Sequence, residues 1–539
     1  MGLHYYFDRE CAYTLPRQPP MTLHSRSTSL AVVISLGAIS VSAQSQSTAA
    51  QSRACERLKS LQLADVRLTE VVGVADSGDH NDNVRAPHCR VAGVVGSSTA
   101  FLVVLPYNWN QRFLMGGNGG YAGTINRGIM REATSGYAVA STNTGHERSA
   151  GGGARWALNS PDAQKDFGYL AVHRTAQVAR SIITAFYGSA PRYSYFTGCS
   201  NGGRQALMEA ERYPDDFDGI ASAAPAAHMS RTGASFLKNI KAAFPDPSYF
   251  EHPIITKASL DLLSAKVLEA CDAIDGVRDG IINDPRDCHF KLESVKACPA
   301  NRPGADCLTD AQRNVIARIY APTTDDRGKV IYPGQPFGGE NLDGGWGPWI
   351  TGRDSGLMHD LHMPSAQAMF MTEGGKYFIF NDPSWDYSRY HGSFYKDATT
   401  WAKFVDADNP DISRFAAHNG KLLLWHGWAD PALNPLATIE YYGKVVARDP
   451  KAKSYVKLYM LPGVLHCGGG PGPSNAPWLD ALTTWVEKGA APDRLIATNN
   501  DVPAKVTLSR PLCPYPQRAV YNGRGNTNDA ANFSCRERR

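Results

Sequence analysis

The chain has 539 residues, with 55 basic and 51 acidic side chains and a formal net charge of +4. This near balance, without a run of basic residues, argues against a nucleic-acid partner. The length is sufficient for a large core and for more than one domain.

The N-terminal segment has the features of a secretory signal peptide. Residues 30–39 are apolar, basic residues precede them, and residues 41–43 are the small residues of a cleavage site. The apolar run is too short to span a membrane, and no later segment is apolar enough. We expect residues 1–43 to be a signal peptide and the mature protein to be secreted or periplasmic, with no membrane partner. Met21 is a better start than Met1, because mixed polar residues rarely precede such a segment.

Apolar runs alternate with a helix-like segment in the first half of the chain and return near its end. The expected elements are strands at residues 101–105, 112–115, 137–141, 193–197, 219–225, 421–427 and 456–463, and a helix at residues 163–188. Strands that alternate with helices are typical of a doubly wound, mostly parallel sheet. The sequence therefore predicts an α/β fold of the α/β-hydrolase type.

A serine follows the predicted strand at residues 193–197. Residues 198–203 are Gly-Cys-Ser-Asn-Gly-Gly, and residues 204–210 are helix-like. Strand, sharp turn and helix form a nucleophile elbow, in which glycines two positions before and after the serine let the backbone turn and expose its Oγ atom. A purely structural turn is the alternative in a chain with 50 glycines. The strand and helix on either side favour Ser200 as a nucleophile.

Two later segments supply partners for this serine in the order serine, acid, histidine. The apolar strand at residues 421–427 precedes Asp430, and His466 lies on the turn after the next predicted strand. We expect His466 to take the proton from Ser200, and Asp430 to orient His466 and stabilise its imidazolium form. His426 is an alternative base, but its place at a strand end before glycine favours a packing role.

A glycine-rich loop, residues 116–120, follows the predicted strand at 112–115. Without side chains in the way, the N–H of Gly117 or Asn118 can approach a substrate oxygen. It would act together with the N–H of Asn201 at the start of the helix that follows the serine. A phosphate-binding loop is the alternative, but the Gly-Lys-Ser/Thr ending is missing.

Cysteines flank both the serine and the histidine. If Ser200 bonds to His466, then Cys199 and Cys467 come within the roughly 4.4–6.8 Å between Cα atoms that a disulfide requires. Apart from Cys11, upstream of the likelier start, the cysteines are even in number, which suggests full pairing in an oxidising compartment. Nearest-neighbour pairing gives the bridges Cys55–Cys89, Cys271–Cys288, Cys298–Cys307 and Cys513–Cys535. Structural zinc is the alternative, but no Cys-x2-Cys pair occurs.

Between residues 228 and 416 the alternation of strands and helices gives way to loops, glycines and aromatic residues. We predict that residues 228–416 form a lid domain above the carboxyl edge of the sheet, inserted between hydrolase segments 44–227 and 417–539. The lid aromatics either shape the substrate pocket or form the core of the lid itself.

One segment of this insertion is rich in carboxylates. Asp272, Asp275 and Asp279 are close in sequence, and the intervening glycines permit tight turns. Together with the backbone carbonyls of Val277 and Ile281, they can provide the oxygen ligands that calcium prefers. A solvated acidic turn is the alternative. The flanking cysteines, residues 271 and 288, favour a structural calcium site, and we expect no organic cofactor.

Taken together, these motifs resemble the tannase and feruloyl esterase family of α/β-hydrolases, which also contains the mono(2-hydroxyethyl) terephthalate hydrolases. The resemblance extends from about Cys55 to Cys535. Its mark is the Cys-Ser, Asp, His-Cys set with the two cysteines joined, and the family's lid calcium site and disulfide pattern are similar to those expected above. The family implies hydrolysis of aromatic-acid esters through an acyl-enzyme on Ser200. Its partner would be a small-molecule or polysaccharide-linked aromatic ester.

The choice of aromatic acid stays open at this stage. Feruloyl esters need an apolar slot, galloyl esters need several hydrogen-bonding groups, and a terephthalate monoester needs a cation such as Arg353. We expect a feruloyl ester, with tannase and terephthalate monoester hydrolase as alternatives. A catalytically inactive binding protein for aromatic ligands and a peptidase are the rival classes. The intact triad argues against a catalytically inactive binding protein. The lid with its acidic loop argues against a peptidase.

Overall fold

The structure, a computed structural model, describes residues 50–75, 83–149, 152–250, 253–352 and 363–538. The expected signal peptide, residues 1–43, lies outside these ranges, as does Arg353. No helix in the described ranges is long and apolar enough to cross a membrane.

A nine-stranded sheet, in the order β1-β2-β3-β5-β4-β6-β7-β10-β11, forms the centre of the fold. Strands β5 to β11 in this order pair in parallel, whereas β1, β2, β3 and β5 pair antiparallel. The strands are β1 (Val66–Val74), β2 (His88–Val95), β3 (Thr99–Pro106), β4 (Arg112–Gly116), β5 (Ala138–Thr142), β6 (Tyr193–Cys199), β7 (Gly219–Ala223), β10 (Lys421–Gly427) and β11 (Val456–Leu461). The predicted mostly parallel sheet of the α/β-hydrolase type is confirmed.

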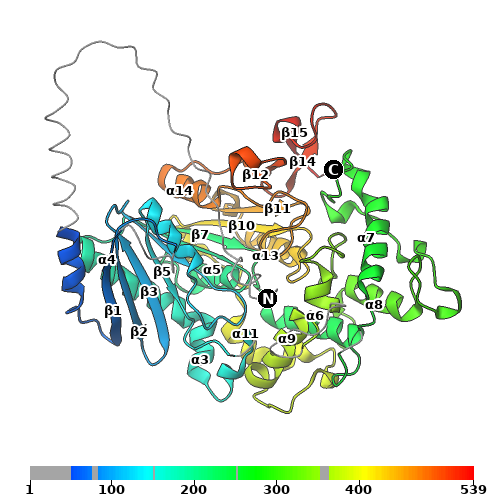
Figure 1. The fold of residues 1–539 in the computed structure, drawn as a ribbon, viewed down its shortest axis with the longest axis horizontal. Coiled ribbons are helices and arrows are strands. Elements are labelled where there is room, and N and C mark those ends of the chain that lie inside the picture. The colour runs from blue at the N-terminus through cyan, green and yellow to red at the C-terminus, as the bar shows by residue number, and fades with distance from the viewer. Residues whose placement is uncertain (1–49, 76–82, 150–151, 251–252, 353–362, 539) are drawn as a thin grey trace, which may run out of the picture.

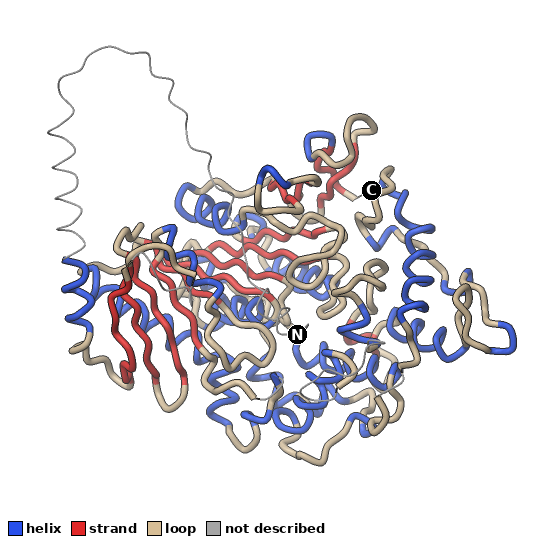
Figure 2. The backbone as a smooth tube through the Cα atoms, in the orientation of Figure 1, coloured by secondary structure: helices blue, strands red, loops and turns tan. Residues whose placement is uncertain are grey.

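Two apolar cores lie on opposite faces of this sheet, because successive strand residues point to opposite sides. In β10, Leu422 and Leu424 belong to one core, and Leu423 and Trp425 to the other. Helices α4 (Ala171–Tyr187), α5 (Asn201–Arg212) and α13 (Pro435–Arg448) contribute to the first core, and α14 (Trp478–Lys488) to the second. Figure 2 shows the red strands with blue helices around them.

Two expectations about local structure need correction. The helix predicted at residues 163–188 is divided into α3 (Pro161–Lys165), a π-helical turn (Asp166–Leu170) and α4. Strands β1 and β2 were not predicted, because β1 has only half-buried and exposed residues and half-buried residues interrupt the buried ones of β2, so neither forms a continuous apolar run.

The segment between β7 and β10 is largely helical rather than a series of loops. Its helices α6 to α9 lie beside the sheet in Figure 1. Several are short, but α7 and α8 carry a helical pattern of buried residues that the sequence analysis overlooked. The helices are α6 (Met229–Ala243), α7 (Lys257–Cys271), α8 (Asp310–Tyr320), α9 (Ala366–Glu373), α10 (Phe394–Asp397), α11 (Thr399–Val405) and α12 (Ser413–Ala417). Buried aromatics of this segment, among them Trp346, Tyr387 and Phe394, form a core of their own.

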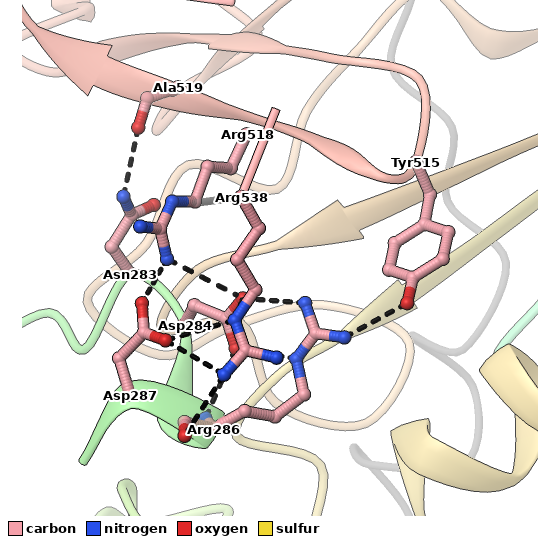
Figure 3. Close-up of polar contacts among 8 residues, drawn as sticks. All are labelled: Asn283, Asp284, Arg286, Asp287, Tyr515, Arg518, Ala519 and Arg538. Carbon is pink, nitrogen blue, oxygen red and sulfur yellow. Dashed lines mark hydrogen bonds and ion pairs between the residues drawn. The ribbon is translucent and has the colours of Figure 1, made fainter. Parts of the chain in front are cut away.

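The C-terminal hairpin, β14 (Gln517–Tyr521) and β15 (Phe533–Glu537), is fastened to the loop that follows α7 (Figure 3). Asn283 donates from Nδ2 to the carbonyl of Ala519 at 2.8 Å, and Arg286 donates from Nη1 to the hydroxyl of Tyr515 at 2.9 Å. Arg518 and Arg538 both pair with Asp287. The chain end therefore braces the inserted segment.

Candidate active site

Ser200 occupies a strained turn between β6 and α5. Its φ of 63° and ψ of −123° are rarely adopted by residues other than glycine. The turn is held by hydrogen bonds from the Ser200 N–H to the Ala223 carbonyl at 3.1 Å and from the Arg204 N–H to the Ser200 carbonyl at 3.0 Å. A Cβ atom at Gly198 would lie 2.5 Å from the backbone of Gly202, so this pair of glycines is required for the close turn. The geometry is that of a nucleophile elbow.

Asp430 and His466 lie on the loops after β10 and β11 and are joined by a hydrogen bond. The distance from Nδ1 of His466 to Oδ2 of Asp430 is 2.7 Å, and the Asp430 side chain is fully buried. Oδ1 of Asp430 accepts the backbone N–H groups of Ala432 at 2.7 Å and Leu433 at 2.9 Å. Burial raises the pKa of this carboxyl, but the neighbouring His466 and His426 outweigh burial and hold the pKa well below its ordinary value. Asp430 is thus an ionised partner for His466.

His426 lies behind the carboxylate rather than at the serine. Its Nε2 is 3.0 Å from Oδ2 of Asp430, and its Nδ1 is 2.8 Å from Oγ1 of Thr438. It is fully buried and does not line the pocket that contains Ser200 and His466. His426 is therefore placed to position Asp430, a role that the sequence analysis missed. The signal was its spacing of four residues from Asp430.

The glycine-rich loop differs from the expectation. The N–H of Gly117 donates to the Thr197 carbonyl at 2.9 Å, and the N–H of Asn118 donates to Oε1 of Gln205 at 3.0 Å. These two donors are already used. Further along the loop, Gly120 and Tyr121 line the same pocket as Ser200 and Asn201. An oxyanion donor from this loop would therefore come from around Gly120 and not from Gly117.

The disulfides pair as predicted. Cys199–Cys467 joins the residue before Ser200 to the residue after His466, with 6.0 Å between the Cα atoms and a sequence separation of 268. The others are Cys55–Cys89, Cys271–Cys288, Cys298–Cys307 and Cys513–Cys535. The Cys199–Cys467 bridge therefore fixes the nucleophile strand β6 to the loop that carries His466.

The pocket at Ser200 is apolar and lies between the sheet and the inserted helices. Its empty space is about 590 Å³, part of which is open to solvent. Trp349 packs edge-on against His466, with 5.1 Å between ring centroids. The other lining side chains from the inserted segment include Met229, Phe236, Phe370, Met371 and Trp401. Among the described lining residues, none other than His466 can carry a positive charge.

The acidic loop lies at the end of α7, next to Cys271. Each of Asp272, Asp275 and Asp279 accepts at least one backbone N–H from within the loop, and Asp279 also binds Nη2 of Arg510 at 2.6 Å. Burial, together with repulsion from Asp279 and Asp272, raises the pKa of Asp275 to about 6. Arg510 pairs with Asp279, whereas Asp272 and Asp275 have only backbone N–H donors among the described residues, and carboxylate oxygens are the ligands that a hard cation prefers.

Comparisons with known proteins agree with this geometry. The tannase and feruloyl esterase family matches residues 84–536. An uncharacterised esterase of Xanthomonas campestris pv. campestris is 35% identical, over 90% of this chain and 92% of its own. The mono(2-hydroxyethyl) terephthalate hydrolase of Piscinibacter sakaiensis is 31% identical, over 83% of this chain and 84% of its own. The crystal structure of feruloyl esterase B from Aspergillus oryzae superposes with a TM-score of 0.79 at 25% identity, covering 90% of this chain and 100% of that one. The chain is therefore an ester hydrolase that belongs to the tannase and feruloyl esterase family.

Proposed function

We propose that this enzyme hydrolyses esters of hydroxycinnamic acids, feruloyl esters above all, through an acyl-enzyme on Ser200. The observation that carries the proposal is the apolar pocket, whose described lining offers an aromatic slot. A galloyl group would need several hydrogen-bonding partners, and a terephthalate monoester would need a cation for its free carboxylate. The described lining provides neither set.

In the proposed mechanism His466 removes the proton from Ser200 as its Oγ attacks the ester carbonyl. The N–H of Asn201 and an N–H from the Gly120 region stabilise the negative oxygen of the tetrahedral intermediate. His466 then gives the proton to the leaving alcohol. Water hydrolyses the acyl-enzyme by the same route, with His466 again as the base. Asp430 stays ionised throughout and stabilises the imidazolium.

The test is a hydrolysis assay with methyl ferulate, methyl gallate and mono(2-hydroxyethyl) terephthalate in parallel. We expect the highest kcat/KM for methyl ferulate, and a loss of about a millionfold in kcat for Ser200→Ala, as found when serine-hydrolase nucleophiles are removed. Circular dichroism should show that the variant is folded. A preference for either other ester would assign that substrate instead, and binding without turnover would favour the binding-protein alternative.

A structural calcium ion is a second part of the proposal. Asp272, Asp275 and Asp279, with the backbone carbonyls of Val277 and Ile281, would hold it and neutralise their mutual repulsion. Because a ligand that binds only the folded chain stabilises it, chelation should lower Tm by several degrees, and calcium should restore it. Asp275→Asn should abolish the response, whereas exposed Asp162→Asn should leave it intact. Equal Tm with and without chelator would contradict the site.

Export to an oxidising compartment is the third part. Five disulfides support it, because such bonds rarely persist in the cytosol. The predicted signal peptide would be removed before Gln44. N-terminal sequencing of the exported protein tests this boundary, and retention of residues 1–43 would refute it.

A further inference from the structure

A second group of ionisable side chains lies at the far end of helix α5 from Ser200. It consists of His173 on α4, Glu209 on α5 and Asp216 on the turn before β7. Each offers one ligand-type atom, and these atoms all lie within 4.8 Å of one another. The group shares no residue with the ester-hydrolysing site.

Glu209 is the feature that needs an explanation. Its side chain is fully buried, its oxygens have no N–H or hydroxyl donor among the described residues, and its hydrogen-bonding neighbour is another carboxyl group, that of Asp216. A buried charge without a positive partner strongly destabilises a fold, unless a proton or a cation neutralises it. One Glu209 oxygen lies within 4.8 Å of the ligand-type atoms of both His173 and Asp216.

The charges around Glu209 do not balance. Asp216 bonds through Oδ2 to Nδ1 of His173 at 2.6 Å and accepts at Oδ1 from Nη1 of Arg180 at 3.1 Å. Arg180 is thus one fixed positive charge beside two carboxylates. The His173 ring stacks on Tyr213 with 3.7 Å between centroids, and its side chain is 20% exposed. The imidazole is therefore the most exposed side chain of the group, since Asp216 is 7% exposed and Glu209 is fully buried.

We propose that His173, Glu209 and Asp216 bind a divalent transition-metal ion, with Zn²⁺ as the best match. One imidazole nitrogen and two carboxylate oxygens, completed by water, make a four-coordinate zinc site. The imidazole disfavours Ca²⁺ and Mg²⁺, which take oxygen ligands. Binding requires neutral His173 and ionised Glu209, so zinc uptake replaces the His173–Asp216 hydrogen bond with coordination and releases bound protons.

The position of the site suggests what the ion would do. Helix α5 begins directly after Ser200, and Glu209 lies in its last turn. An ion shared with α4 and with the turn before β7 would tie the C-terminal end of this helix to its neighbours. The expected effect is therefore on stability.

The experiment uses the full chain, stripped of metal by a chelator and returned to buffer with excess calcium, so that the acidic loop at Asp275 is kept saturated. We expect calorimetric titration with zinc chloride to give one site per chain and zinc to raise Tm by several degrees. Glu209→Gln keeps the shape of the side chain but removes its charge, and it should lose both the site and the Tm response. His173→Gln, at a half-exposed position, should do the same.

His418→Ala is the matched control. His418 forms an exposed pair with Asp215 at 2.6 Å, and no third ligand-type side chain among the described residues joins this pair. This variant should keep the zinc response. The proposal is overturned if Glu209→Gln still binds one zinc per chain, or if the wild-type chain binds none. In the latter case a proton holds the position, since burial and the nearby Asp216 raise the pKa of Glu209 well above its ordinary value.

Discussion

Asp430 and Glu209 are both fully buried carboxylates beside a histidine, yet their surroundings are opposite. Asp430 receives two hydrogen bonds from imidazoles and two from backbone N–H groups. Glu209 has no N–H or hydroxyl donor among the described residues, and its hydrogen-bonding neighbour is a second carboxyl group, that of Asp216. The donors around Asp430 stabilise its ionised form without any added ion. A triad acid must be ionised to orient the histidine. Burial beside a histidine therefore does not identify a catalytic acid, whereas the supply of donors does.

The largest effect should follow from removing the charge of Asp430. Asp430→Asn keeps the side-chain volume but offers an N–H where His466 needs an acceptor, which favours the wrong imidazole tautomer. We expect kcat to fall by about ten-thousandfold, as for such a change in serine proteases. Steady-state kinetics on methyl ferulate measure this. A loss of less than tenfold would show that another group orients His466.

A smaller effect should follow from removing the bridge that holds the two halves of the site together. Replacing Cys199 and Cys467 by alanine leaves Asp430 and its donors unchanged but frees the loop that carries His466. We expect kcat to fall about tenfold, with a much smaller change in KM, because a misplaced base costs rate rather than binding. The Cys298–Cys307 pair, replaced in the same way, is the control. Unchanged kcat in the folded double variant would refute the positioning role.

The smallest effect should come from replacing His426, because His426 supplies only one of the hydrogen bonds to Asp430. This variant tests how far each donor contributes to the difference between Asp430 and Glu209. His426→Phe removes that donor and should lower kcat a few-fold to tenfold, less than the full worth of a hydrogen bond to a charged group, because Asp430 keeps its other donors. His426→Gln retains a side-chain N–H and should recover part of the loss. The bell-shaped pH profile of kcat/KM should shift on its acidic limb for the Phe variant only. Equal profiles for both variants would indicate a packing role.

Much of the fold and of the candidate site could be predicted from the sequence because the relevant signals are local. Ser200, Asp430 and His466 each follow an apolar strand, and the cysteines next to two of them imply that these loops meet. The helices of the inserted segment were missed because several are only four to eight residues long and the loops between them dominate the sequence, although α7 and α8 carry a readable helical pattern. The π-helical turn at Asp166–Leu170 leaves no trace in composition.

The remaining errors concern contacts between distant residues. The sequence shows that Gly117 lacks a side chain, but not that its N–H is taken by Thr197, which lies in a neighbouring strand. In the same way, His173, Glu209 and Asp216 come from three different elements, and no spacing rule brings them together. Hydrogen-bond partners across the sheet and between helices are set by tertiary packing, which a single sequence does not reveal.

The Cys199–Cys467 bridge also closes a covalent ring around every residue from Cys199 to Cys467, and this ring contains the whole inserted segment. A protease that cuts an exposed loop of that segment would open the ring without releasing either piece. The nicked enzyme would run as one band on a non-reducing gel and as two after reduction. The elements that shape the pocket can thus be cleaved while Ser200 and His466 remain joined.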